Sequence, residues 1–136
     1  MKVVIDTNVL ISGIFWQGLP FEVLKLWVNG SIEVVVTEKI LEEYYRNITK
    51  IDNKKRVSEH WIAFIAENSI LVEDREVIKI CRDATDDVFI NCAVLGNANY
   101  IISGDNDLLT LGKVMKLEIV KPADYLKLVK DKLRGV

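Results

Sequence analysis

The sequence has few of the residues that build zinc sites and disulfide frameworks. It contains one histidine, His60, and two cysteines, Cys81 and Cys92, which stand without metal-ligand spacing. A single histidine and two lone thiols exclude a Cys/His zinc site. We expect both cysteines to be reduced in a cytoplasmic protein, Cys92 to lie in the core, and His60 to be an ordinary helix residue.

The sequence also lacks long apolar runs and an excess of positive charge. No apolar run approaches the roughly 18–20 residues of a membrane span, and the N-terminus does not have the pattern of a signal peptide. The net charge of −2 excludes a globally basic nucleic-acid-binding protein. A local phosphate-binding patch stays open at Lys50, Lys54, Lys55 and Arg56, a cluster that fits a solvated helix start equally well.

The length and composition are those of one ordinary globular domain. The chain has 136 residues, of which 50% are hydrophobic and 28% are charged, which is enough to bury a core. Short β-rich runs alternate with helical segments, which is typical of βαβ units around a parallel sheet. We therefore predict a single α/β domain over residues 1–136 with about five strands, the last of them an edge strand. The predicted strands are Lys2–Asp6, Ile32–Val36, Ile70–Val72, Tyr100–Ser103 and Leu117–Val120.

Helical segments are expected between these strands. Pro20 suits the first turn of one helix and Gly30 its C-terminal cap, while Thr37 suits the N-cap of the next helix. A polar stretch, Glu73–Lys79, separates the third strand from the helix that follows. The predicted helices are Val9–Phe15, Pro20–Asn29, Glu38–Thr49, Val57–Glu67, Asp86–Asn97, Asp107–Leu111 and a C-terminal helix that starts at Pro122.

Four carboxylates occur where this topology would bring strand ends together. Asp6 and Asp105 follow apolar strands, Asp86 opens the helix before the fourth strand, and Glu43 lies on the helix after the second strand. Functional groups gather outside the carboxyl ends of the strands in open α/β sheets. Like charges packed there raise one another's pKa unless a cation offsets them. No Lys or Arg stands beside three of the four, so the pattern predicts a divalent metal with oxygen ligands and metal-assisted phosphoryl chemistry.

Each carboxylate also has a simpler structural interpretation. Asp6 and Asp86 could cap helices, Asp105 could belong to a bare turn, and Glu43 could be a surface residue. Helical periodicity places Glu42 and Glu43 on opposite sides of one apolar stripe and does not choose between them.

The polar neighbours of these residues have expected roles of their own. Asp87 should lie nearer the edge of its helix than Asp86, and Asp83 should be a cap or turn residue. We expect Asp107 to cap the turn that follows it and Ser103 to be placed to hydrogen-bond a neighbouring carboxylate.

Four segments, in this order and spacing, resemble PIN domains over essentially the whole chain. The similarity is to the subgroup regarded as toxins of prokaryotic toxin–antitoxin pairs. The segments are Val-Val-Ile-Asp6-Thr-Asn-Val-Leu-Ile-Ser, Leu-Glu-Glu43-Tyr-Tyr-Arg, Arg82-Asp-Ala-Thr-Asp86-Asp-Val-Phe-Ile-Asn-Cys-Ala and Tyr-Ile-Ile-Ser-Gly-Asp105-Asn-Asp-Leu-Leu.

The resemblance implies a Rossmann-like three-layer α/β/α fold and a metal-dependent endoribonuclease that cuts single-stranded RNA with Mg²⁺ or Mn²⁺. It also implies an antitoxin protein as a partner and a homodimer. The catalytic and metal-binding quartet of the family falls on Asp6, Glu43, Asp86 and Asp105, which favours Glu43 over Glu42, and the supporting polar positions fall on Asn8, Ser103 and Asp107.

The sequence departs from the pattern of the subgroup at two positions. Ala84 stands where proline is usual and Ser103 where threonine is common, and neither change removes a ligand.

Two alternatives come from other functional classes. A phospho-receiver domain would have a similar length and topology, but it needs an acidic pair after the first strand and a phosphorylatable aspartate after the third. Here Asp6 is followed by Thr7 and Asn8, and Asp74 lies in an ordinary polar loop. The other alternative is a PIN-like module that binds RNA or protein without catalysis, against which the intact quartet argues.

Large apolar side chains are numerous for a domain of this size. Core packing is their common fate, but some of this surface could form the interface of a homodimer. The residues concerned are Phe15, Trp16, Trp27, Trp61, Phe64, Tyr125 and Leu126.

Overall fold

The fold is built on one mixed sheet that is parallel except at one edge. The computed structural model describes residues 1–52 and 56–134, with side chains as far as residue 132. The strand order is β3-β2-β1-β4-β6-β5, and only the β5–β6 pair is antiparallel. The strands are β1 Lys2–Ile5, β2 Glu33–Val36, β3 Ser69–Leu71, β4 Tyr100–Ile102, β5 Lys113–Val114 and β6 Leu117–Val120.

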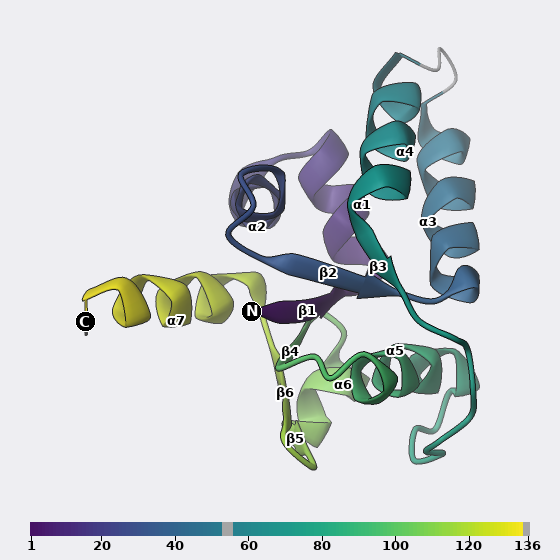
Figure 1. Ribbon diagram of the computed structural model, residues 1–136, viewed down its shortest axis with the longest axis vertical. Coiled ribbons are helices and arrows are strands. Elements are labelled where there is room, and N and C mark those ends of the chain that lie inside the picture. The colour runs from purple at the N-terminus through teal and green to yellow at the C-terminus, as the bar shows by residue number, and fades with distance from the viewer. Residues whose placement is uncertain (53–55, 135–136) are drawn as a thin grey trace.

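Helices cover both faces of this sheet, so the predicted three-layer α/β/α architecture is confirmed (Figure 1). Helices α1 to α4 lie on one face, α5 and α6 lie on the other, and α7 extends from the end of β6. The helices are α1 Thr7–Phe15, α2 Gly18–Val28, α3 Glu38–Ile51, α4 Arg56–Asn68, α5 Ala84–Leu95, α6 Asn106–Leu111 and α7 Pro122–Arg134.

The central strands are apolar on both faces because helices pack against each face. Val3, Val4 and Ile5 of β1 are fully buried, as expected for a strand in the middle of a parallel sheet. The predicted helix ends are also found: the Thr37 hydroxyl accepts a hydrogen bond from the Ile40 N–H at 3.3 Å, and Gly30 ends α2 with a φ of 82°. These local signals set where α3 begins and where α2 ends.

The predicted edge of the sheet was wrong. Leu117–Val120 is β6, and the edge is the two-residue strand β5, which pairs with β6 through a tight turn at Met115, where φ is 56°. A strand of two residues is too short to show an alternating pattern in the sequence.

The candidate basic patch falls partly outside the described part of the chain, since Lys54 and Lys55 are not described. Lys50 and Arg56 are exposed. Both lie at the end of the α3–α4 hairpin opposite the sheet, far from the start of α3 at Thr37 (Figure 1).

Within the described residues, no single helix has the length and apolar character to cross a membrane, although α1 and α2, bent by 96° at their junction, pass together by length and composition.

We predict that Gly96→Ala lowers the free energy of unfolding by about 1–3 kcal/mol. Gly96 ends α5 against β2, and a Cβ there would overlap the Cγ1 of the fully buried Val35. Thermal denaturation measures the loss. Gly104→Ala is the matched control, because a Cβ at Gly104 meets no atom within 4 Å. If the contact is the cause, adding Val35→Ala should make the double variant more stable than the sum of the two single effects.

Candidate active site

The carboxyl ends of β1 and β4 bring two of the four predicted carboxylates together. The Asp6 N–H donates to the Ile102 carbonyl oxygen at 3.0 Å, so the strand ends stay paired at this edge. The buried Ser103 hydroxyl donates to Asp6 Oδ2 at 2.6 Å and accepts from the Asp105 N–H at 3.0 Å. The predicted hydrogen bond from Ser103 to a carboxylate is therefore confirmed, and it links Asp6 to the backbone of Asp105.

The third carboxylate, Asp86, lies at the N-terminus of helix α5, at the same edge of the sheet. Because α5 returns the chain to the start of β4, its N-terminus lies at the carboxyl ends of the strands, and Asp86 is in its first turn. Burial, followed by the charge of Asp105, raises the pKa of Asp86 to about 6. When Asp86 is protonated it can donate a hydrogen bond to the Asp105 carboxylate. A negative charge on Asp105 therefore disfavours ionisation of Asp86.

The pKa of Asp6 is raised for the same reasons as that of Asp86. Burial raises the pKa of Asp6, the charge of Asp105 adds to the rise, and the Ser103 hydrogen bond opposes it. Over the described residues, the ion pairs join Lys25 to Glu22, Lys39 to Asp74 and Lys113 to Glu118. No described Lys or Arg side chain therefore pairs with the three clustered aspartates.

Among the described residues, no hydrogen bond or ion pair joins the Glu43 side chain to this cluster, although the charges of Glu43 and Asp6 both act on Tyr44. The Glu43 side chain is half-buried, whereas that of Glu42 is exposed. The neighbouring Tyr44 is fully buried and its hydroxyl donates to the Ile5 carbonyl oxygen, which fixes α3 against the end of β1. Burial raises the pKa of Tyr44 well above its usual value, and the charges of Cys92, Asp6 and Glu43 add to this.

An open groove of about 780 Å³ gives solvent and ligands access to this edge. Asp105 is half-buried in its wall, and the predicted supporting residues Asn8 and Asp107 are exposed along it. The remaining lining residues are Val9, Ser12, Pro20, Gly104, Asn106 and Pro122.

The cap of α6 differs from the prediction. Asp105, and not Asp107, is the N-cap, since Asp105 Oδ1 accepts from the Asp107 N–H at 3.0 Å. One oxygen of Asp105 is thus engaged in holding the loop. Asp83 is a cap as predicted: its Oδ1 accepts from the Thr85 N–H at 3.0 Å.

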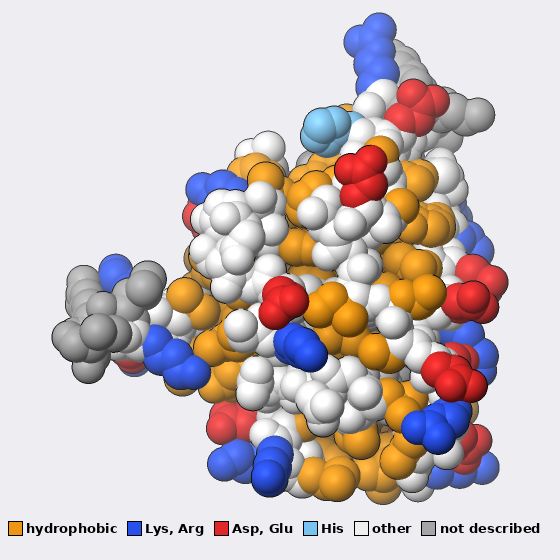
Figure 2. Space-filling view, in the orientation of Figure 1, with side chains coloured by type: hydrophobic (Ala, Val, Ile, Leu, Met, Phe, Trp, Pro, Cys, Tyr) orange, Lys and Arg blue, Asp and Glu red, His pale blue; other side chains and the backbone are white. Residues whose placement is uncertain are grey.

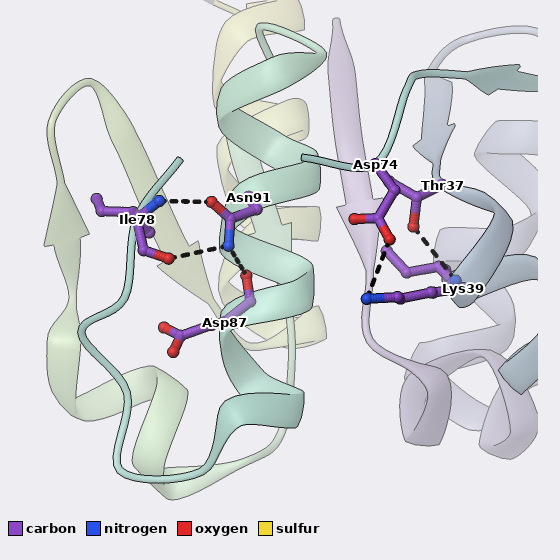
Figure 3. Close-up of polar contacts among 7 residues, drawn as sticks. Thr37, Lys39, Asp74, Ile78, Asp87 and Asn91 are labelled. Atoms are coloured by element: carbon purple, nitrogen blue, oxygen red, sulfur yellow. Dashed lines mark hydrogen bonds and ion pairs between the residues drawn. The ribbon is translucent and has the colours of Figure 1, made fainter. Parts of the chain in front are cut away.

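Asp87 and Asn91 have a structural role that the sequence analysis missed. Both are buried, and Asp87 is about as buried as Asp86. Asn91 accepts from the Val77 and Ile78 N–H groups, each at 2.7 Å, and donates to the Ile78 carbonyl at 3.0 Å (Figure 3). Asp87 Oδ1 accepts from the N–H groups of the next residues along, at 3.1 Å from Ile80 and 2.9 Å from Cys81.

These bonds hold residues 77–81, which lie outside the strands, along α5. The signal for these bonds in the sequence is the pair of polar residues four positions apart on a helix whose other buried side chains, apart from Asp86, are apolar.

The donor set fits a hard divalent cation. Three carboxylates that repel one another without a basic partner are stabilised by a bound cation. The buried Thr7 hydroxyl next to Asp6 also has no hydrogen-bond partner among the described residues, which leaves a polar atom free to face a bound water. As placed, however, no three described His, Cys, Asp or Glu side chains are close enough together to hold a metal ion. A cation held by all three carboxylates would need them closer together than they stand here.

Comparison with known families agrees with the fold. The model of the PIN domain matches residues 2–107. The chain belongs to the PIN-domain family. All four predicted carboxylates lie inside the matched segment.

Two individual proteins are also similar to this PIN domain. The uncharacterized protein MJ1680 of Methanocaldococcus jannaschii is 33% identical over 142 aligned positions, which cover 93% of this chain and 90% of that protein. A solved structure, VapBC2 from Rickettsia felis bound to a DNA fragment from their promoter, superposes with a TM-score of 0.60. It covers 88% of this chain and 97% of that one at 12% identity, so it shows a shared fold.

We predict that Asp86→Asn stabilises the metal-free protein at pH 8 by about 1 kcal/mol, after allowance for solvent screening. The pKa of Asp86 is raised to about 6 in the folded state from an ordinary value of 3.8. Its contribution to stability is therefore fully present below pH 3.8 and is lost as the pH rises through 6. Thermal unfolding in EDTA should show a melting temperature about 3 °C higher than wild type at pH 8 and no gain at pH 3.5.

Asp87→Asn is the matched control one residue away. Burial opposes ionisation of Asp87, but the hydrogen bonds from Cys81 and Ile80 outweigh it and lower the pKa. The stability supplied by this carboxylate is present above its unfolded pKa and lost as the pH falls, so this variant should be less stable than wild type at pH 8. A gain in both variants would show that the effect is not specific to the cluster.

Proposed function

We propose that this PIN domain is a divalent-metal-dependent endoribonuclease that hydrolyses phosphodiester bonds of single-stranded RNA. The observation that carries the proposal is the group of Asp6, Asp86 and Asp105 at the carboxyl edge of the sheet, without a basic partner in the described chain and beside an open groove. Such a group suits a cation that bridges protein carboxylates and substrate phosphate. Family membership supports nuclease chemistry at this edge.

Asp6, Asp86 and Asp105 would hold Mg²⁺ or Mn²⁺, with Glu43 as a further ligand, directly or through water. When bound, the ion would activate a water molecule for in-line attack and stabilise the leaving oxygen.

The protein's own groups set the geometry around that ion. Ser103 holds one oxygen of Asp6 and the Asp105 backbone in a fixed relation, and Tyr44 fixes the helix that carries Glu43. Asn8 and Asp107 line the groove where the substrate strand would enter and could orient its sugar and phosphate oxygens.

We also propose that the protein is the toxin of a toxin–antitoxin pair. The solved neighbour is a VapBC2 complex with promoter DNA, and the sequence resembles toxins of this type. The partner would then be an antitoxin protein that also binds DNA. A small neighbouring gene for a DNA-binding protein, whose product co-purifies with this chain and inhibits it, supports this role. Failure to bind or inhibit counts against it.

The cleavage prediction is direct. Purified protein with Mn²⁺ or Mg²⁺ should cut a single-stranded RNA, and EDTA should stop the reaction. Asp6→Asn and Asp105→Asn should each reduce the rate constant at least about 100-fold, because each removes a carboxylate from the site that stabilises the transition state. Gel electrophoresis of end-labelled RNA measures the rate.

Two neighbouring glutamates test whether Glu43 belongs to the catalytic quartet, and the Asp6→Asn variant tests for a contaminating nuclease. Glu43→Gln should lower the rate constant, whereas Glu42→Gln, on the exposed side of α3, should leave it near wild type. Undiminished cleavage by Asp6→Asn protein would identify a contaminating nuclease. A wild-type protein that binds RNA but does not cut it would support a catalytically silent module instead.

We further propose a homodimer, in which the two-fold axis would set two acidic sites beside a shared groove. Of the large apolar side chains considered for an interface, Trp27 and Tyr125 are buried in the core, while Trp16 is exposed. Leu19, three residues after Trp16, is exposed as well. Light scattering at micromolar concentration should give about twice the chain mass. A mass near 15.5 kDa that does not change with concentration would contradict the dimer.

A further inference from the structure

A row of side chains along α1 leads out of the acidic groove. Asn8 and Ser12 line the groove and stand four residues apart, so they lie on one face of the helix. Trp16 is four residues further on, and its backbone N–H donates to the Ser12 carbonyl at 2.9 Å, which continues the helical turn. The row spans about 12 Å from Asn8 to Trp16 at the rise of an α-helix.

Trp16 stands out among the tryptophans of the chain because it is left in solvent. Its side chain is 68% exposed, whereas Trp27 is 3% exposed and packs edge-to-face against Phe64. Phe15 supports Trp16 from one side, with ring centroids 6.0 Å apart and planes at 66°. This edge-to-face contact leaves most of the indole surface uncovered.

Trp16 does not itself line the groove, but it follows Ser12, which does, by one helical turn. Side chains on a helix lean toward its N-terminus, so the surface beside Trp16 is the turn that contains Ser12. Beyond Trp16 the backbone bends sharply, with φ of 60° at Gln17 and 69° at Gly18, and α2 leaves at 96° to α1. Pro20 of α2 lines the same groove. The bend between α1 and α2 therefore leaves Trp16 at a corner of the backbone, with groove-lining residues on both sides of it in the sequence.

The charge of the protein makes an uncharged contact with RNA valuable. The net charge is −2, and the groove itself is acidic. On the face in Figure 2, the Lys and Arg side chains of the described residues are dispersed among acidic ones and do not form a continuous track. Stacking of a base on an aromatic ring needs no positive charge and accepts any base.

We propose that Trp16 is a stacking platform for an unpaired base of the substrate strand, a few nucleotides from the bond that is cut. The inference rests on the proposed endoribonuclease function and names a positioning residue for it. The row from Asn8 through Ser12 gives the path of the strand between the acidic cluster and the indole ring. Stacking there holds the strand in the groove, whereas the carboxylates act on the phosphodiester.

Binding of a fluorescein-labelled single-stranded RNA of random sequence tests this with the full chain carrying Asp6→Asn, which removes cleavage. Adding Trp16→Ala should raise the dissociation constant by roughly 5- to 100-fold. Trp16→Phe should restore much of the affinity, because a smaller aromatic ring still stacks. Met115→Ala is the matched control: Met115 is 74% exposed, on the β5–β6 turn, and should leave the affinity unchanged.

Abasic sites moved one position at a time along a defined RNA separate stacking from a change in fold. In the Asp6→Asn protein, one position near the cut site should weaken binding, and that position should lose its effect when Trp16→Ala is added. Equal binding with and without Trp16, or a loss of affinity that is the same at every abasic position, overturns the proposal.

A protein interface at Trp16 and the exposed Leu19 is the other use of this corner. A fall in mass by light scattering in Trp16→Ala, with RNA affinity unchanged, would assign the corner to that interface and overturn the stacking role. The endoribonuclease proposal fails separately: if wild-type protein does not cleave RNA yet shows the position-specific abasic effect, Trp16 still stacks bases and only the catalytic assignment is wrong.

Discussion

Mutual repulsion among three carboxylates at one sheet edge is the constraint on which the rest of the site depends. The pairing of β1 with β4 fixes Asp6 beside Ser103, and the return of α5 to the start of β4 places Asp86 opposite Asp105. Nothing in the described chain neutralises these groups by an ion pair. The fold therefore keeps together a cluster of negative charge that lowers its stability. Such clusters are common at functional sites.

The surrounding structure is arranged to hold that charge in place. Apolar strands, a buried Tyr44 hydroxyl and the Ser103 bridge fix the carboxylates from the side of the sheet. On the other side, Asp87 and Asn91 hold residues 77–81 along α5 by bonding their backbone; Figure 3 shows the bonds between Asn91 and Ile78. Asp86 and Asp87 are thus adjacent in sequence and opposite in role, since one has a raised pKa and the other a lowered one.

Much of this arrangement could be predicted from the sequence because it follows from long-range rules with strong local signals. Apolar runs located the parallel strands, and the strand ends located Asp6 and Asp105. Asp86 was found because it lies on the inward stripe of its helix. Glu43 could not be separated from Glu42 by periodicity alone, and the resemblance to PIN domains made that choice; in the structure Glu43 is half-buried and Glu42 exposed.

The other features could not be predicted, because they leave no periodic pattern in the sequence. The segment held by Asn91 has no repeating pattern, so neither its path nor its anchors could be read before the fold was known. The strand β5 has two residues, and the cap of α6 lies two residues before the predicted one, at Asp105. In each case the deciding interaction is a single hydrogen bond or turn.

Isothermal titration calorimetry with Mn²⁺, in two buffers of different ionisation enthalpy, tests most directly the claim that the carboxylate cluster binds a metal ion. Since the pKa of Asp86 is raised to about 6, metal binding at pH 6 should release about half a proton from this group, and at pH 8 almost none. Asp86→Asn should lower the release at pH 6. Binding at pH 6 without proton release, or no binding at all, would contradict a metal site at this cluster.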